Sequence, residues 1–229
     1  MFLITGATGN IGSGVVNLLK EQGHDVRALV RDPSRASRLP AGIDIAVGDL
    51  DDADSVSAAL HDIDGVFLLH AGSGVTQTQI MIDAARATGV RRIVLLSSIG
   101  ARLRPLPTLG TTLAAREDLL RASGLDVTYL QPNTLMSNAL AWADGIRDEN
   151  RVVDPTGPGC MPCVDPDDIA RVAARVLIED GHVGHGYILT GPDALTSREQ
   201  VEILSEVLGR TIDVVDVTPE QLAQDSIEH

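Results

Sequence analysis

The chain has 229 residues, 44% of them hydrophobic and only 2% aromatic, and its formal net charge is −14. This charge opposes binding to nucleic acid or anionic lipid, and so few aromatic residues argue against a platform that stacks bases. No apolar run reaches the roughly 20 residues that span a bilayer, and the N-terminus lacks the basic segment of a signal peptide. We therefore expect a cytoplasmic globular protein that contacts neither membrane nor nucleic acid.

Short apolar runs alternate with helical patterns from the first residues onward. Strands are expected at 2–4, 26–30, 43–47, 65–69, 92–96 and 127–130, and helices at 11–21, 52–60, 76–88 and 111–122. This alternation predicts βαβ units with right-handed crossovers. The expected fold class is therefore α/β, with a doubly wound parallel sheet whose strands are buried on both faces.

The regularity loosens after Pro132. Residues 152–168, VVDPTGPGCMPCVDPDD, are rich in Pro, Gly and Asp and predict a loop. Beyond them we expect helices at 168–178 and 197–208 and a strand at 187–189. Asp165, Asp167 and Asp168 are expected to cap the first of these helices.

Three glycines stand between the first strand and the first helix, in the stretch TGATGNIGSG. Gly6, Gly9 and Gly12 have the spacing that provides a tight turn, close approach of a phosphate to the backbone, and close packing of helix on strand. The N-terminus of the helix then favours an anion. An ordinary glycine-rich turn is the alternative, but the strand before and the helix after favour dinucleotide binding.

The end of the second expected strand indicates which dinucleotide is bound. Arg31 stands near the place where NAD-binding sheets carry an acid, and Arg35 and Arg38 follow closely. A guanidinium there pairs with a 2′-phosphate, which favours NADP(H). In the alternative, Asp32 neutralises Arg31 or takes the role of the acid. After the third strand, Asp49 is expected to accept from the adenine amine or to cap a helix, and Leu50 to cover the ring.

Motifs along most of the chain resemble the NmrA-like group of atypical short-chain dehydrogenase/reductases. They are TGATGNIG, ALVRDP, GDLDD, MIDAARATGVRRIVLLSS, LLRASGLDVTYLQPNTLMSN, VDPDDIARVAARVL and YILTGPDALTSREQVEILSEVLGR. The group includes bacterial NADPH quinone reductases and redox-sensing regulators. The resemblance implies an NADP(H)-binding Rossmann core at 1–132. Residues 133–229 are expected to complete the sheet and form a small C-terminal substrate-binding region within one compact unit.

The resemblance also implies the roles of individual residues. It assigns the pyrophosphate to Gly6, Thr8, Gly9, Asn10, Ile11 and Gly12, the 2′-phosphate to Arg31, and the adenine to Asp49 and Leu50. Leu69 and His70 are expected beside the pyrophosphate and nicotinamide ribose. Ser97, Ser98, Pro132 and Asn133 are expected near the nicotinamide, and Asn138 in the substrate pocket. Trp142 is expected to wall that pocket or to anchor the core.

The proton-transfer pair of the wider superfamily is missing. Typical members carry Tyr and Lys four residues apart, on one face of a helix, so that both reach one pocket. In the helix that contains TTLAARED, Leu113 takes the first place and Glu117 the second. Leucine donates no proton. The remaining catalytic candidates are Ser98, Thr111, Thr112, Glu117 and His70; His70 is either a proton donor or simply part of the loop.

Three functions remain compatible with these residues. The first, which we favour, is reduction of a quinone or conjugated carbonyl compound by NADPH, with the developing oxyanion met by a hydroxyl or water. The second is a non-catalytic NADP(H) sensor, and the third a lyase or isomerase on the same fold. For all three functions we expect a small-molecule ligand and a protein that is a monomer or homodimer. Cys160 and Cys163 lack the further ligands of a zinc site, so no metal is expected.

Overall fold

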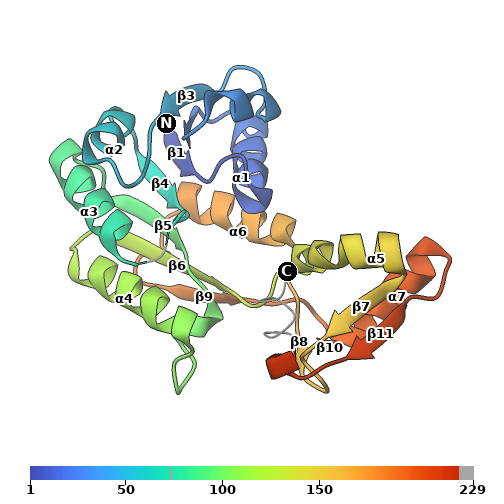
Figure 1. Ribbon diagram of the computed structural model, residues 1–229. Coiled ribbons are helices and arrows are strands. Elements are labelled where there is room, and N and C mark those ends of the chain that lie inside the picture. Colours follow the sequence, from blue (N-terminus) through green and yellow to red (C-terminus); the bar gives the residue numbers. More distant parts are fainter. Residues whose placement is uncertain (73, 222–229) are drawn as a thin grey trace. The chain divides into compact units, whose positions relative to one another are not determined.

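A computed structural model describes residues 1–72 and 74–221 (Figure 1). Its helices are α1 (Asn10–Glu21), α2 (Ala53–Ala59), α3 (Thr76–Thr88), α4 (Thr108–Ala122), α5 (Ala143–Glu149), α6 (Pro166–Ile178) and α7 (Ser197–Leu208). Its strands are β1 (Phe2–Thr5), β2 (Val26–Val30), β3 (Asp44–Val47), β4 (Gly65–Leu68), β5 (Arg92–Leu96), β6 (Asp126–Pro132), β7 (Arg151–Asp154), β8 (Cys160–Met161), β9 (Gly186–Leu189), β10 (Leu195–Thr196) and β11 (Asp213–Asp216). Short 3₁₀ helices are η1 (Pro33–Arg38), η2 (Ile99–Ala101) and η3 (Met136–Trp142).

The chain divides into two compact units. The sheet unit comprises Met1–Asn133 and Pro166–Leu189, and the small unit comprises 134–165 and 190–221 of the described chain. The expected division at residue 132/133 therefore marks only the first passage between units. Residues 166–189 return to the sheet unit because α6 and β9 are needed to cover and extend its sheet.

The sheet unit contains a seven-stranded sheet in which every neighbouring pair is parallel. The strand order is β3-β2-β1-β4-β5-β6-β9. The chain therefore starts at the central strand β1, adds β2 and β3 on one side, and then adds β4, β5, β6 and β9 on the other. This is the Rossmann order with one further strand, and it confirms the predicted fold class. The order reverses between β1 and β4, which leaves a crevice beyond the carboxyl ends of these strands.

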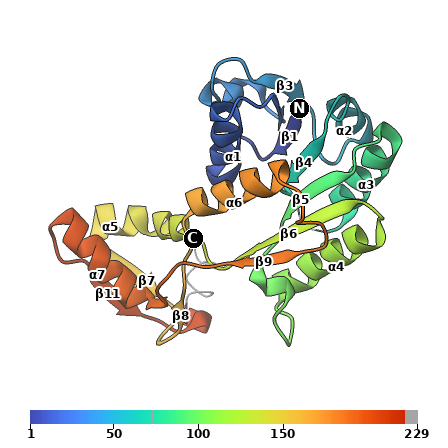
Figure 2. The same cartoon turned by 180° about the vertical axis from the view of Figure 1, so that it is seen from behind.

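Helices cover both faces of this sheet (Figure 1 and Figure 2). On one face, α2, α3 and α4 bury an aliphatic cluster that includes Leu60, Met81 and Leu120 against Leu3 and Ile93 of the strands. On the other, α1 packs against α6. Strands buried on both faces are near-continuously apolar, which explains why this half of the sequence predicted its strands well.

The contact between α1 and β1 is unusually close at one residue. An added Cβ on Gly12 lies only 2.2 Å from the Gly6 carbonyl oxygen, a distance that real Cβ atoms do not show. Gly6 itself has a φ of +62°, in the left-handed region that glycine tolerates best. The two glycines therefore bring the first turn of α1 directly over the end of β1.

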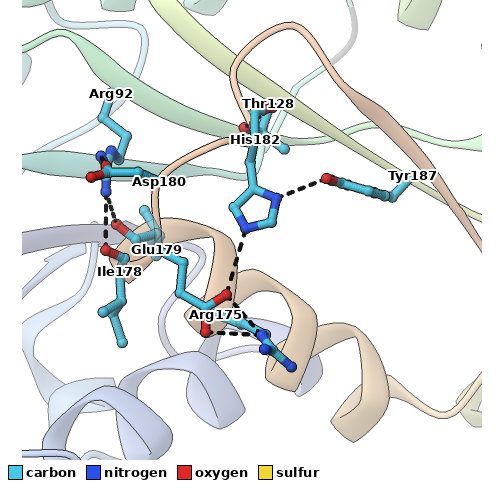
Figure 3. A network of polar contacts seen from close by, with 9 residues as sticks. Arg92, Thr128, Arg175, Ile178, Glu179, Asp180, His182 and Tyr187 are labelled. Atoms are coloured by element: carbon cyan, nitrogen blue, oxygen red, sulfur yellow. Dashed lines mark hydrogen bonds and ion pairs between the residues drawn. The ribbon is translucent and has the colours of Figure 1, made fainter.

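The edge strand β9 is tied to α6 by a network of polar side chains (Figure 3). Arg92 of β5 donates to the carbonyl of Leu177 at 2.7 Å and pairs with Asp180. The hydroxyl of Thr128 donates to the carbonyl of His182 at 2.9 Å, and the His182 ring shares a 2.7 Å hydrogen bond with the Tyr187 hydroxyl. These contacts fix the turn that leads into β9, which pairs with β6 at the edge of the sheet.

The loop predicted at 152–168 is the clearest error among the expected elements. It contains most of β7 and all of β8, which pair with β11 and β10 respectively. Neither β10 nor β11 was predicted. Such two- to four-residue strands form by pairing with a distant segment, and the local sequence pattern does not predict them.

The small unit has its own core. Ile146, Val152, Val201 and Ile212 are buried together, and Trp142 packs against them. Trp142 thus has the core contacts that were one of its two expected roles. Within residues 1–72 and 74–221, no helix combines the length and apolarity that crossing a bilayer requires.

We predict that Gly12→Ala lowers the free energy of unfolding by about 3 kcal/mol, because the new methyl group forces α1 away from β1. Chemical denaturation measures this change. Gly100→Ala is the matched control, since its Cβ meets no atom closer than 3.6 Å. Equal stability of the two variants would show that the close approach is not a constraint on the fold.

Candidate functional site

A cavity of about 440 Å³ lies in the sheet unit at the carboxyl ends of β1, β2, β3 and β4. Its lining residues are Thr5, Gly6, Ala7, Thr8, Leu29, Val30, Arg31, Asp32, Arg35, Gly48, Asp49, Leu50, Leu69 and Ala71. Predicted cofactor residues among them are Gly6, Thr8, Arg31, Asp49, Leu50 and Leu69. Predicted residues outside this lining are Gly9, Asn10, Ile11, Gly12, His70, Ser97, Pro132 and Asn133. The cavity occupies the crevice where open α/β sheets bind ligands.

The glycine loop forms one wall of this cavity. The Gly9 amide donates to the Gly6 carbonyl at 3.0 Å, and Gly9 is the N-cap of α1. No side chain in the described chain caps this helix end. Its first amides are therefore available to an anion, as the sequence predicted.

Two arginines line the opposite end of the cavity. Arg31 and Arg35 are exposed, and neither forms an ion pair with any described residue. Asp32, the acid between them, caps η1 by accepting from the Ser34 amide at 2.9 Å. Hydrogen bonds from Ser34 hold the pKa of Asp32 below its ordinary value. Asp32 thus caps η1, and its charge also interacts with that of Arg35. Arg31 and Arg35 line the cavity without a direct ion pair in the described chain.

The segment after β3 supplies the side of the cavity next to these arginines. Asp49 accepts from the Asp51 amide at 3.1 Å, and Leu50 is buried. The N-cap of α2 is Asp52, whose side chain accepts from the Asp54 amide. Asp49 therefore shapes the turn without capping the helix, which corrects that alternative expectation.

Thr5 connects the ends of β1 and β4, a role that the sequence analysis did not predict. Its hydroxyl oxygen accepts from the Leu69 amide at 2.7 Å, and the hydroxyl donates to the carbonyl of Leu69 or Phe67. Beyond Leu69, the Ala71 amide donates to Gln77 at 3.1 Å, and Gln77 in turn donates to Asp51 at 2.9 Å. Thr5 is the last residue of β1 and Gln77 the second residue of α3, and no motif in the sequence assigns a role to either of them.

His70 is in a poor environment for a proton donor. Its Nε2 shares a 2.8 Å hydrogen bond with the Thr78 hydroxyl, and its Nδ1 is buried without a partner in the described chain. Burial, reinforced by the nearby charge of Arg116, lowers the pKa of His70 to about 3. His70 is therefore neutral at physiological pH, which argues against the imidazolium acid that was one of its expected roles.

Glu117 is the centre of a buried network. Its carboxylate accepts from the Ser97 hydroxyl at 2.6 Å, from the Gln131 amide at 2.7 Å and from the Arg121 guanidinium at 2.9 Å. The Arg121 guanidinium also lies 4.4 Å from the centre of the Tyr129 ring. Glu117 joins α4 to the ends of β5 and β6, and each of its oxygens already accepts a hydrogen bond.

The other catalytic candidates surround the start of α4. Ser98 donates to the Pro132 carbonyl at 3.3 Å and accepts from the Gly100 amide at 3.2 Å, which caps η2. Thr112 is half-buried on α4, and Leu113 is buried. The structure thus brings Ser97, Ser98 and Glu117 to one region of the sheet unit.

The predicted substrate residues lie in the small unit. Asn138 is exposed within η3, and Trp142 ends the same 3₁₀ helix. Cys160 is exposed and Cys163 is buried, and burial raises the pKa of the Cys163 thiol. In the described parts of both units, no group of three or more His, Cys, Asp or Glu side chains is placed to hold a metal ion.

We predict that His70 makes the protein less stable in acid. Because its folded pKa of about 3 lies below the ordinary 6.5, the unfolded chain binds a proton between these values that the folded chain does not. The free energy of unfolding therefore falls as pH drops through this window. His70→Asn should reduce the loss between pH 7 and pH 5 by about 2 kcal/mol in urea denaturation.

His61→Asn is the control for this measurement, because the His61 side chain is exposed. The comparison uses the difference between the two pH values, so any loss of stability common to both cancels. If both variants lose as much stability in acid as the unmodified protein, His70 is not the group responsible.

Comparison with known proteins agrees with this geometry. A family model described as NAD(P)H-binding matches residues 6–180. NAD(P)H azoreductase from Xenophilus azovorans is 37% identical over 227 residues, covering 98% of this chain and 79% of the relative. A Streptomyces griseus enzyme, (4-alkanoyl-5-oxo-2,5-dihydrofuran-3-yl)methyl phosphate reductase, is 38% identical over 93% of this chain and 75% of its own length.

A solved structure shares the fold over nearly the whole chain. The NADPH-dependent quinone oxidoreductase of Escherichia coli, complexed with NADPH, is 29% identical with a TM-score of 0.83. The match covers 95% of this chain and 78% of that protein. The glycine loop, the open end of α1 and the sheet order are what a bound dinucleotide requires. The chain belongs to the NAD(P)H-binding family of Rossmann-type proteins.

Proposed function

We propose that this protein is an NADPH-dependent reductase of a quinone or a related conjugated acceptor. The observation that carries the proposal is the pair of unpaired arginines, Arg31 and Arg35, at the end of a cavity built on a dinucleotide-binding loop. The similar proteins named above are reductases of azo, quinone and oxo-dihydrofuran compounds, and these acceptors share conjugated unsaturation.

The choice of NADP(H) over NAD(H) rests on charge. A 2′-phosphate is a dianion that guanidinium groups bind through charge-assisted hydrogen bonds. An acid that accepts from a ribose 2′-hydroxyl is what NAD-binding sheets use instead. Asp32 is the only acid at that place, and it accepts from the Ser34 amide. We infer that Arg31 holds the 2′-phosphate and that Arg35 assists.

The remaining cofactor contacts follow from the cavity and from α1. We infer that the amides of the first turn of α1, with Gly6 and Thr8, hold the pyrophosphate. Asp49, Leu50 and Leu69 line the cavity. We infer that Asp49 and Leu50 contact the adenine, and that Leu69 lies beside the pyrophosphate and the nicotinamide ribose. Ser97, Pro132 and Asn133 complete the set of residues proposed around the nicotinamide. Bound NADPH supplies the hydride.

The chain's own contribution to proton transfer is small in this proposal. Leu113 provides no acid, and the Ser97 hydroxyl donates to Glu117. A conjugated acceptor spreads its developing negative charge over several atoms, so a hydroxyl such as that of Ser98 or Thr112, or water, is a sufficient donor. The absence of a Tyr–Lys pair therefore favours conjugated acceptors over isolated ketones.

Leu113 also favours a second candidate function, that of a non-catalytic NADP(H) sensor. A protein that binds NADP(H) and reports its redox state does not catalyse a reaction. Such a sensor does not need the proton-donating acid that Leu113 replaces. In either case we expect a small-molecule ligand, a cytoplasmic location and a monomer or homodimer that does not bind nucleic acid.

We predict that the protein oxidises NADPH faster than background in the presence of a quinone or enone. A panel of quinones, enones and azo dyes, followed by loss of NADPH absorbance, measures this. No turnover with any acceptor, together with clearly different affinities for NADP⁺ and NADPH, would contradict the reductase and support the sensor.

We predict that Arg31→Ala raises the dissociation constant of NADPH by about tenfold or more and leaves that of NADH nearly unchanged. The reason is the loss of a charge-assisted hydrogen bond worth about 1.5–3 kcal/mol. Titration of cofactor fluorescence measures both constants. Arg38→Ala is the matched control, because Arg38 is exposed on the same 3₁₀ helix as Arg35 and does not line the cavity. If Arg31→Ala weakens the binding of NADPH and NADH equally, Arg31 does not bind the 2′-phosphate.

A further inference from the structure

Arg116 of α4 is a buried cation that has no acidic partner. It is 7% exposed, and it forms no ion pair with any residue of the described chain. Burying a charged side chain is costly unless other groups compensate for the lost water. A role for Arg116 must therefore explain what makes its burial tolerable.

The guanidinium binds the backbone between β4 and α3. Its Nε donates to the Gly74 carbonyl at 2.7 Å, and one of its terminal nitrogens donates to the Gly72 carbonyl. Two donors of one rigid, planar group thus fix two carbonyls of a single connection. Lysine, with a compact ammonium on a flexible stem, does not reproduce this geometry.

The same connection borders the cavity. Leu69 and Ala71 line it, and the Ala71 amide is held from the other side by Gln77 of α3. Gln77 is buried and also reaches Asp51, beside the predicted adenine residues. Side chains from α3 and α4 therefore hold one backbone segment at the edge of the cavity.

The burial of the Arg116 charge also affects pKa values nearby. Burial lowers the pKa of Arg116, and the positive charge of Arg116 contributes to the lowered pKa of His70. Two carbonyl dipoles offset the cost of burial only in part, since no carboxylate neutralises the charge.

We propose that Arg116 is a positioning residue for the cofactor: through Gly72 and Gly74 it holds the backbone next to Ala71 against the pyrophosphate and nicotinamide half of NADPH. This inference rests on the proposed function, in which NADPH is the ligand. Different arginines then serve the two halves of the cofactor site. Arg31 and Arg35 serve the adenosine 2′-phosphate, whereas Arg116 serves the half of the cofactor that carries the nicotinamide.

The test compares two ligands that differ by this half. NADPH reaches the whole site, and adenosine 2′,5′-bisphosphate occupies only the adenosine end. We expect Arg116→Gln to weaken NADPH by about tenfold or more and to change the affinity of the bisphosphate by less than about twofold. Arg116→Lys should recover only a minor part of the loss, because it restores the charge but not the two fixed hydrogen bonds.

Arg86→Gln is the matched control. Arg86 also donates to a backbone carbonyl, that of Ser123 at 3.2 Å, but it lies near the far end of α3, close to Gly89. It should leave both affinities unchanged. Melting temperature with and without each ligand shows that each variant is folded.

Hydrogen exchange on the unmodified protein tests the inference without any variant. NADPH should slow exchange of the Ala71, Gly72 and Gly74 amides, and the bisphosphate should not. The inference is overturned if Arg116→Gln weakens both ligands equally, if it weakens neither, or if the two ligands protect these amides alike. Failure of the unmodified protein to bind either ligand would instead contradict the proposed function.

Discussion

The approach of α1 to β1 at Gly12 is the constraint on which the rest of the sheet unit depends. Because a methyl group there would lie 2.2 Å from the Gly6 carbonyl oxygen, only glycine lets the helix begin directly over the strand end. That placement aims the uncapped amides of α1 into the crevice where the strand order reverses. The same placement lets α1 lie flat along the sheet beside α6. One close contact therefore serves both packing and anion binding.

Positive charge is used sparingly in this acidic chain. There are 18 Lys and Arg residues against 32 Asp and Glu, and nine of the 17 arginines form ion pairs with carboxylates in the described residues. Arg31, Arg35 and Arg116 form no ion pair in the described residues, and all three belong to the sheet unit near the carboxyl ends of its strands. An anionic ligand is then attracted to one place on a molecule that otherwise repels anions.

The buried carboxylate of Glu117 has a different use. Its hydrogen bonds to Ser97, Gln131 and Arg121 connect α4 to the ends of β5 and β6. The wider superfamily places a lysine at this helical position to assist proton transfer. Here Glu117 stiffens the scaffold through its hydrogen bonds. With Leu113 one turn earlier, neither position of the superfamily's Tyr–Lys pair carries a tyrosine or a lysine. A reductase of conjugated acceptors tolerates that loss better than a reductase of simple ketones.

The sequence by itself determined the parts of this protein that depend on local pattern. Strands buried on both faces are continuous apolar runs, and helices have a 3.6-residue period, so the parallel α/β sheet followed from local pattern. The glycine spacing of the first turn predicted the dinucleotide-binding loop, and the resemblance to a family supplied the Rossmann fold. The arginines after β2 were equally readable, because they stand at a fixed distance from the glycines.

Tertiary structure alone decided the rest. The strands β7, β8, β10 and β11 form by pairing with distant segments. The Pro- and Gly-rich sequence around β7 and β8 therefore predicted a loop, and β10 and β11 were not predicted at all. The capping of η1 by Asp32, the low pKa of His70 and the network of Glu117 all depend on which side chains the fold brings within hydrogen-bond distance. Arg116 is the sharpest case. Nothing local distinguishes it from its neighbours on α4, because its burial and its two carbonyl partners exist only once α4 packs beside the β4–α3 connection.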